Sequence, residues 1–259
     1  MPTALITGAS SGLGEEFAYQ LAREHYDLAL VARRKDRLES VAAKAREFGA
    51  KNVAIFAADL SAPGAVAQLH ADVSGAGMDV SYLVNNAGFG THGSFCELPI
   101  EREIEEIELN VTALVALCRM FAPAMVARKS GVIINVASTA AFQPVPWMAT
   151  YGATKAFVLS FSEALSSEFK ESGVTVLALC PGPTRTEFQA VANTAEAAFP
   201  DFAYMDAATV VAQGIASAKQ GRAVRINGLM NFVMAQTTRL APRAMVRRIA
   251  GAMFREEPS

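Results

Sequence analysis

Short apolar runs alternate along the chain with longer segments in which apolar residues recur at helical spacing. The runs are rich in Val, Ile, Leu and Ala, and each predicts a buried strand. They are Thr3–Thr7, Asp27–Ala32, Asn52–Asp59, Val80–Gly88, Gly131–Ser138, Val174–Gly182 and Arg222–Gly228. The helical pattern is plainest after the first two runs, over Glu15–His25 and Lys35–Gly49.

This alternation predicts an α/β fold. Continuous apolar strands separated by helices form a parallel sheet that is covered on both faces, with right-handed crossovers. We therefore expect a doubly wound, Rossmann-like parallel sheet of about seven strands in a three-layer α/β/α arrangement. The chain shows no internal repeat and no low-complexity linker, so residues 1–259 are predicted to form a single domain.

The carboxyl ends of the predicted strands are the expected ligand site, because doubly wound sheets bind ligands beyond those ends. Five of the runs carry Thr7, Asp59, Asn85, Ser138 and Pro181 at or near their ends.

Composition narrows the class of protein. Hydrophobic residues make up 52% of the 259 residues, which argues against disorder, and a formal net charge of −2 gives no general case for nucleic-acid binding. Three separated cysteines and three histidines suggest neither a disulfide framework nor a metal site. We see no signal peptide and no apolar run of the ~18 residues that cross a bilayer. The expected location is the cytoplasm.

A glycine-rich turn, TGASSGLG, joins the first predicted strand to the first helix. Gly8 allows a tight turn, Gly12 lets the backbone approach a pyrophosphate, and Gly14 lets the helix pack close to the sheet. The helix N-terminus offers free N–H groups and the positive end of its dipole. A strand, this turn and a helix in that order predict a dinucleotide site.

The second strand ends with Ala32, Arg33 and Arg34, where sites that prefer NAD usually place an acidic residue. Guanidinium groups suit a 2′-phosphate instead. The sequence therefore favours NADP(H), with Arg33 as the leading contact and Arg34 as the second.

Tyr151 and Lys155 lie four residues apart in an apolar, alanine-rich segment, so on a helix they share one face. In chain order, the glycine turn, Asp59, Asn85–Gly88, Asn110, Ser138, Tyr151, Lys155 and Pro181–Gly182 form a set that resembles the short-chain dehydrogenase/reductase (SDR) family. The resemblance covers nearly the whole chain. It implies an oxidoreductase that transfers a hydride between NADPH and a carbonyl or alcohol substrate.

The residue types explain this chemistry. A nearby ammonium is expected to lower the pKa of the Tyr151 phenol, which would then exchange a proton with the substrate oxygen. Ser138 would hydrogen-bond that oxygen. The resemblance implies that Lys155 also holds the nicotinamide ribose and that Asn110 fixes a water on a proton path. The cofactor contacts expected by resemblance and pattern are Gly8, Ser10, Ser11, Gly12, Leu13, Gly14, Arg33, Arg34, Asp59, Leu60, Asn85, Asn86, Ala87, Gly88, Tyr151, Lys155, Pro181, Gly182, Thr184 and Thr186.

An apolar substrate is the weaker part of the expectation. Residues 184–205 resemble a substrate lid and contain Phe188, Phe199, Phe202 and Tyr204. These aromatics suggest a hydrophobic ketone, aldehyde or 3-oxoacyl compound, although they suit a core or an interface equally well.

The C-terminal tail, residues 229–259, mixes apolar residues with arginines, and Pro242 is expected to divide it into two helices. Such a tail suits cleft covering, subunit packing or a membrane surface. The resemblance favours a homodimer or homotetramer. Two rival functions remain open: a catalytically idle NADP(H)-binding regulator, and a protein that binds a membrane surface through this tail.

Overall fold

A seven-stranded parallel sheet forms the centre of the protein, in a computed structural model that describes residues 2–188 and 203–254. The strand order is β3-β2-β1-β4-β5-β6-β7, as a doubly wound fold requires. The strands are β1 (Thr3–Thr7), β2 (Asp27–Ala32), β3 (Val53–Ala57), β4 (Val80–Asn85), β5 (Gly131–Val136), β6 (Val174–Cys180) and β7 (Val224–Ile226). The predicted fold class is confirmed.

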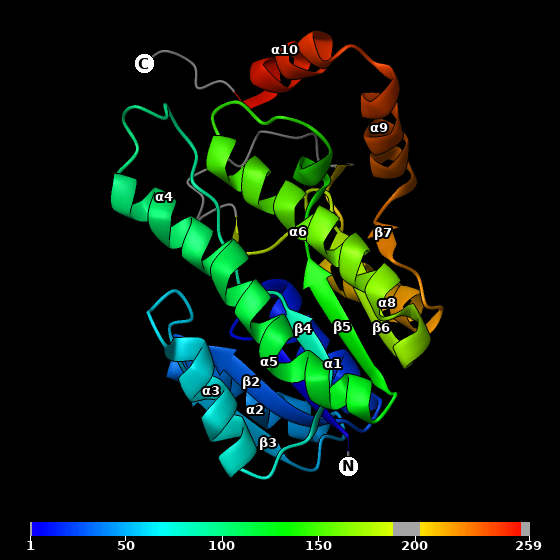
Figure 1. Ribbon diagram of the computed structural model, residues 1–259. Coiled ribbons are helices and arrows are strands. Elements are labelled where there is room, and N and C mark those ends of the chain that lie inside the picture. The colour runs from blue at the N-terminus through cyan, green and yellow to red at the C-terminus, as the bar shows by residue number, and fades with distance from the viewer. Residues whose placement is uncertain (1, 189–202, 255–259) are drawn as a thin grey trace.

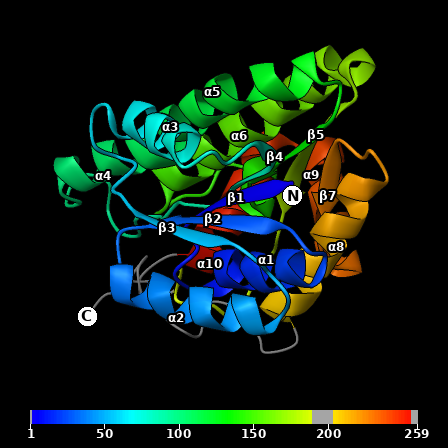
Figure 2. The ribbon, with the colours of Figure 1, turned by 90° about the horizontal axis from the view of Figure 1, so that it is seen from below.

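Helices cover both faces of the sheet, and Figure 2 shows the three layers edge-on. One face carries α1 (Gly12–Arg23), α2 (Lys35–Glu47) and α8 (Ala207–Lys219). The other carries α3 (Ala65–Gly75), α5 (Leu114–Ala127) and α6 (Ala149–Glu168), with α4 (Ile100–Ile107) leading into α5. Short 3₁₀ turns, η2 (Thr139–Phe142) and η3 (Lys170–Ser172), follow β5 and α6.

Two hydrophobic clusters, one on each face, hold these layers together. Phe17 and Leu21 of α1 are fully buried against Ile6 and Leu30 of the sheet. On the other face, Met125 of α5 is fully buried in the cluster that contains Leu5 and Ile133. Strands buried on both faces explain why the runs read as continuously apolar rather than alternating.

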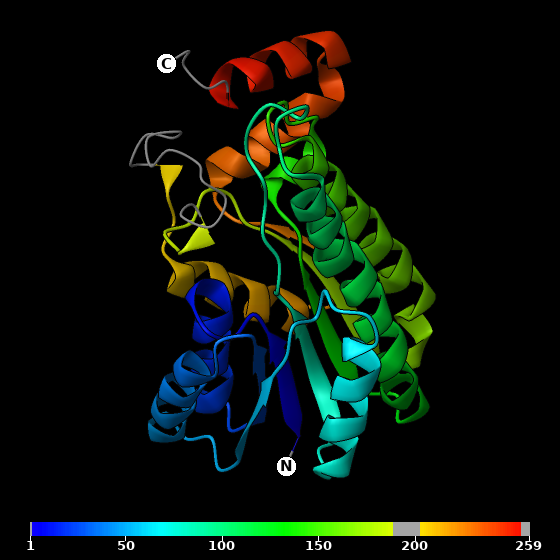
Figure 3. The same ribbon diagram turned by 90° about the vertical axis from the view of Figure 1, so that its left-hand side faces the viewer.

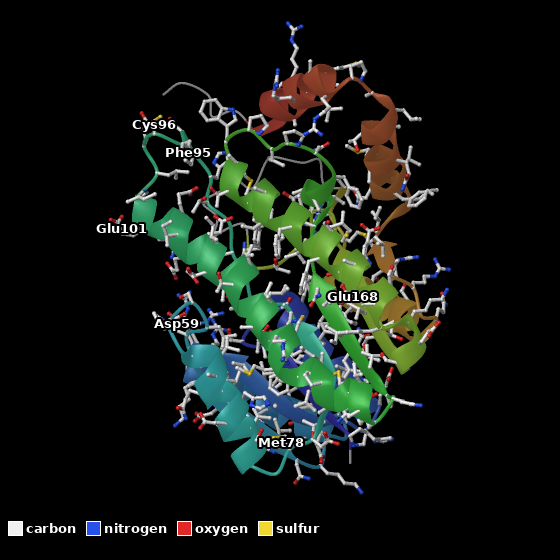
Figure 4. The ribbon with its side chains drawn as sticks, in the orientation of Figure 1. Asp59, Met78, Phe95, Cys96, Glu101 and Glu168 are labelled. Carbon is white, nitrogen blue, oxygen red and sulfur yellow. The ribbon has the colours of Figure 1, made fainter. Side chains whose placement is uncertain are left out.

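Five strands end before the predicted runs do. The residues left over, among them Asp59, Gly88, Ser138 and Gly182, leave the sheet as loops at the carboxyl ends of the strands. In Figure 4, Asp59 lies at that end of the sheet, near α3. The shortened strands therefore deliver the candidate site residues to one edge.

A single π-helical turn, η1 (Glu108–Ala113), joins α4 to α5 and contains Asn110. Such turns insert an extra residue into a helix and are frequent at functional sites. The continuous helical stretch Ile100–Ala127 is also long and apolar enough to cross a membrane, contrary to the expectation from the sequence. Its apolar side packs against the sheet through Leu117, Phe121 and Met125, as in a core helix of a globular protein.

The C-terminal tail forms two helices, α9 (Leu229–Leu240) and α10 (Arg243–Phe254), so the predicted break at Pro242 is confirmed. Both lie beyond the end of the sheet toward which the strands point (Figures 1 and 3). The middle of the predicted lid, with Phe199 and Phe202, lies outside the described residues. The assignment of the whole chain to one domain stays a prediction.

Candidate active site

A cavity of about 940 Å³ opens at the carboxyl ends of the strands. It lies at the neighbouring strands β1 and β4, from which the chain continues toward opposite edges of the sheet. Most of the predicted site residues line it. These are Gly8, Ser10, Ser11, Gly12, Leu13, Arg33, Arg34, Asp59, Leu60, Asn86, Ala87, Gly88, Ser138, Tyr151, Lys155, Pro181, Gly182, Thr184 and Thr186. Gly14, Asn85 and Asn110 are not among the lining residues and lie behind the wall.

The glycine turn has the conformation that its sequence predicts. Gly8 and Gly12 have φ of +64° and +58°, a region that other residues rarely adopt. A Cβ on Gly14 would lie 2.2 Å from the carbonyl oxygen of Gly8. The turn is therefore a backbone cradle that side chains would fill, and its size and position fit a dinucleotide pyrophosphate at the start of α1.

Arg34 lies over this cradle. Its Nη2 atom donates to the Ser10 hydroxyl at 3.1 Å and to the Ser11 hydroxyl at 3.0 Å. The same atom bonds the Glu187 carboxylate at 2.8 Å. Arg34 is thus held at the place where a phosphate beside the glycine turn would be bound.

Arg33 points elsewhere along the cavity rim. Its Nη1 atom bonds Glu105 of α4 at 3.2 Å and lies 3.9 Å from the Asp59 carboxylate. Asp59 also accepts hydrogen bonds from the backbone N–H and the hydroxyl of Ser61. The sequence ranks Arg33 above Arg34, whereas the geometry places Arg34 nearer to the glycine turn.

The end of β4 braces β1 and β5. Thr7 Oγ1 accepts hydrogen bonds from the backbone N–H groups of Asn86 and Ala87, and the Asn86 amide donates to the Thr7 carbonyl at 2.9 Å. Asn85 is buried and donates to Asn135 on β5 at 2.8 Å. Asn85 therefore supports the sheet, while Asn86 and Ala87 shape the cavity wall.

Tyr151 and Lys155 lie side by side on α6, as the four-residue spacing predicts. The Lys155 Nζ atom lies 5.7 Å from the centre of the Tyr151 ring and donates to the Val136 carbonyl at 2.9 Å. Ser138 follows β5 and caps η2 through its hydroxyl oxygen. Both α6 residues are buried and line the same cavity as the glycine turn.

The expected lowering of the Tyr151 pKa by Lys155 is wrong for this arrangement of side chains. Burial raises the pKa of Tyr151 to about 12, and its hydrogen bond with Ser138 only partly opposes that effect. Burial also lowers the pKa of Lys155 to about 8, against the pull of the Glu106 carboxylate. Desolvation prevails because both polar heads lie in the protein interior.

Asn110 is held rigidly in the π turn. Its side-chain oxygen accepts from the backbone N–H of Phe89 at 3.2 Å, and its amide donates to the Phe89 carbonyl and to Thr154 of α6. A Cβ on Gly88 would lie 2.7 Å from Asn110 Oδ1 and 3.5 Å from Lys155 Nζ. Asn110 therefore adjoins Lys155 across the backbone of Gly88.

The loop after β6 forms the other side of the cavity. The Pro181 carbonyl accepts a hydrogen bond from the N–H of Thr139 at 2.9 Å. Thr184 forms an isolated β-bridge with Met205. A Cβ on Gly182 would lie 2.2 Å from the Asn231 amide of α9. This close approach joins α9, the first helix of the C-terminal tail, to the cavity.

Comparison with known proteins assigns the chain to a family. Residues 2–197 match the family model described as short chain dehydrogenase. The chain belongs to the short-chain dehydrogenase family. A very-long-chain 3-oxoacyl-CoA reductase of Laccaria bicolor is 37% identical over 175 residues, which are 67% of this chain and 52% of that protein. The chain thus spans about half the length of such curated relatives.

Solved structures of the family match over nearly the whole chain. A short-chain dehydrogenase from Sphingobium yanoikuyae in complex with NADPH is 35% identical, with a TM-score of 0.83 over 100% of this chain and 98% of that one. The bulky-bulky ketone specific alcohol dehydrogenase from Comamonas testosteroni is 31% identical, with a TM-score of 0.78 over 96% of both chains.

Two groups of residues in this short-chain dehydrogenase were not predicted from the sequence. The first is an apolar part of the cavity wall. Val145, Met148, Leu229 and Met234 contribute to it from segments that are distant in sequence, so no local pattern predicts it. The second is a pair of buried glutamates, Glu103 and Glu106. Their three-residue spacing puts both on one face of α4, but the isoleucines of α4 are exposed, so the apolar pattern pointed to the wrong face.

Proposed function

We propose that this short-chain dehydrogenase reduces a carbonyl compound with NADPH, or oxidises the corresponding alcohol, with Tyr151 as the proton donor or acceptor. The observation that carries the proposal is the convergence on one cavity of Tyr151, Lys155 and Ser138 with the glycine turn and Arg34. A proton-transfer group beside a dinucleotide cradle is the arrangement that hydride transfer to a carbonyl group needs.

The residues present fit NADP(H). The glycine turn would hold the pyrophosphate, and Arg34, assisted by Arg33 and Ser11, would hold the 2′-phosphate by charge-assisted hydrogen bonds. The relative from Sphingobium yanoikuyae binds NADPH, which supports this choice. When bound, the cofactor supplies or accepts the hydride.

The electrostatics of the cavity favour carbonyl reduction. With a pKa of about 12, the Tyr151 phenol is protonated at neutral pH and is ready to donate to a carbonyl oxygen. Ser138 would hydrogen-bond the same oxygen while negative charge develops there. Lys155, with a pKa of about 8, is able to gain and lose a proton near neutral pH and so to restore the phenol.

The proposed substrate is apolar next to its carbonyl group. Beyond Tyr151 the cavity is bounded by Val145, Met148 and Phe188, whose ring lies 5.3 Å from that of Tyr151. Leu229 and Met234 of α9 extend this wall. The names of the two relatives, a 3-oxoacyl-CoA reductase and an alcohol dehydrogenase specific for bulky ketones, point to the same chemistry.

A homologous series tests the substrate class. We expect kcat/KM for NADPH-dependent reduction of 3-oxoacyl thioesters and 2-alkanones to rise about fourfold per added methylene until the wall is filled, because each buried CH₂ contributes ~0.8 kcal/mol. Steady-state NADPH oxidation measures it, with a polar hydroxyketone of matched length as control. A flat series, or a preference for the hydroxyketone, would reject the apolar substrate.

The oligomeric state and the cytoplasmic location stay proposals. The long helices that contain Asn110 and Tyr151 expose Ile100, Ile104, Met120 and Phe157 to solvent. Exposed apolar side chains along these helices support subunit packing there.

A further inference from the structure

Two buried carboxyl groups lie behind the catalytic face of α6 and have no place in the mechanism described above. Glu103 is 4% exposed and Glu106 is 0% exposed, and both belong to α4. An isolated pair of buried carboxylates costs several kcal/mol unless a proton or a cation neutralises it. Their neighbours therefore decide what they do.

The hydroxyl of Thr91 connects the two carboxyl groups. Thr91 Oγ1 lies 2.5 Å from Glu103 Oε1 and 2.8 Å from Glu106 Oε2, and the Thr91 N–H donates to Glu106 Oε2 at 2.9 Å. A hydroxyl group has one hydrogen and donates to one acceptor only. The Thr91 hydroxyl hydrogen is therefore shared between the two carboxyl groups, and a proton on either carboxyl group would complete the second hydrogen bond.

The cluster lies close to the reacting side chains. The segment from Gly88 to Thr91 packs along α6: Gly88 adjoins Lys155, and a Cβ on Gly90 would lie 2.9 Å from the Tyr151 ring. Thr150, which precedes Tyr151, donates to the Glu103 carboxylate. Asn110, one turn after Glu106, bonds Thr154 of α6. The cluster thus contacts the catalytic turn of α6 at several points.

Glu106 has an unused acceptor. Its Oε1 atom is buried and has no hydrogen-bond partner among the described residues. Burial, together with the Glu103 charge, raises the pKa of Glu106 to about 7, while Thr91 and Lys155 lower it. The pKa of Lys155 is lowered to about 8 by burial, and the Glu106 carboxylate is the first of the groups that oppose this lowering.

We propose that Glu106 is a positioning residue of the active site: its buried carboxylate is the counter-charge that keeps Lys155 protonated beside Tyr151. This proposal rests on the Tyr151–Lys155 chemistry described above. After Tyr151 protonates the substrate, its phenolate takes a proton from the Lys155 ammonium. The Lys155 amine then regains a proton from solvent, and the Glu106 carboxylate stabilises the ammonium that forms.

Other titratable groups face the same region. Glu103 lies on α4, His92 follows Thr91 in the loop, and Tyr151 shares α6 with Lys155. Cys180 on β6 acts on Lys155 from the sheet side. Of these, Glu103 is the one joined to Glu106 through a shared hydroxyl group.

The pH profile of reduction at saturating NADPH tests the proposal. In Glu106→Gln the carboxylate that stabilises the Lys155 ammonium is gone, so the alkaline limb of kcat moves to lower pH by about one unit, the low end of the effect of an opposite charge within ~4–6 Å. We expect kcat to fall about twofold at pH 7 and about tenfold well above the limb, less than the ~10²-fold or more of a direct proton donor.

Thr91 provides a second pair of variants. Thr91→Val removes the hydroxyl that lowers the pKa of Glu106, so Glu106 stays neutral to higher pH. The alkaline limb of kcat should therefore again move to lower pH. Thr91→Ser keeps the hydroxyl and should keep the wild-type limb. Glu101→Gln, at the exposed outer end of α4 (Figure 4), is the control on the same helix and should match the wild type.

A merely structural role for Glu106 would lower kcat equally at every pH, and an unmoved limb in Glu106→Gln would overturn the proposal. Infrared difference spectra add a readout that needs no substrate. A carboxylic-acid C=O band should vanish as the pH rises through about 7 in the wild type and be missing in Glu106→Gln. Persistence of that band in the variant contradicts the proposal, whereas a failure of the wild type to reduce any carbonyl compound counts against the proposed function alone.

Discussion

Tyr151 shows how the same burial that assembles the site also sets its protonation. The phenol and the Lys155 amine are both removed from water, and each is pushed toward its neutral form. A neutral phenol is the proton donor that carbonyl reduction requires.

Arg34 is the residue on which cofactor preference is expected to depend. Because its guanidinium lies on Ser10 and Ser11, Arg34→Asp should lower the NADPH-to-NADH ratio of kcat/KM roughly 10- to 150-fold, which corresponds to the ~1.5–3 kcal/mol of a hydrogen bond to a charged group. Steady-state kinetics with both cofactors measures it.

Arg33→Asp is the matched comparison. Arg33 is bound to Glu105 and lies near Asp59, so its loss should change the ratio less. If Arg33→Asp has the larger effect, the ranking drawn from the sequence is right and the one drawn from the geometry is wrong.

At the level of single residues, the sequence predicted which side chains meet but not their charge state. The spacing of Tyr151 and Lys155 on one helix face follows from helical geometry alone. Their pKa values depend on burial by residues from other elements, which no local pattern contains. Glu106 likewise required the fold, because its partner Thr91 lies on a loop fifteen residues away.

Among the elements, α1 carries two functions. Its N-terminus forms the cradle through Gly12 and Gly14, and its apolar face fixes that cradle to the sheet through Phe17 and Leu21. The packing of this helix should therefore control both stability and cofactor affinity.

Phe17→Ala tests this dependence. Phe17 is 0% exposed, so its truncation should lower the free energy of unfolding by about 3–5 kcal/mol. The control is Phe95→Ala, since Phe95 is 64% exposed and its loss should cost within ~0.5 kcal/mol. Chemical denaturation at one protein concentration compares them, and equal unfolding midpoints would show that α1 is not anchored in this way.

The strands and the first helices could be predicted because their apolar pattern is local, and β1 and β2 end where the runs Thr3–Thr7 and Asp27–Ala32 end. The π turn at Asn110 could not be predicted in this way. Nothing in the spacing of ELNVTA separates it from an α-helix, and its hydrogen bonds to Phe89 and Thr154 are tertiary contacts.

The whole molecule gathers one cavity from segments that are distant in sequence. The glycine turn, the ends of β4, β5 and β6, and α9 all contribute to its lining. The parallel sheet makes the first four converge, because its strands all end at one edge. The contribution of α9 comes instead from tertiary packing, through Gly182 and Asn231. The sequence left cleft covering as one of several alternatives for this helix.

The proposed function depends most directly on Tyr151, and Tyr151→Phe is its sharpest test. The substitution removes one oxygen from a ring that is already buried, so the fold and NADPH affinity, followed by fluorescence titration, should stay as in the wild type. Reduction of the best carbonyl substrate should fall by at least ~10²-fold, since the phenol is the proton donor. A variant that binds NADPH and turns over at the wild-type rate would contradict the account.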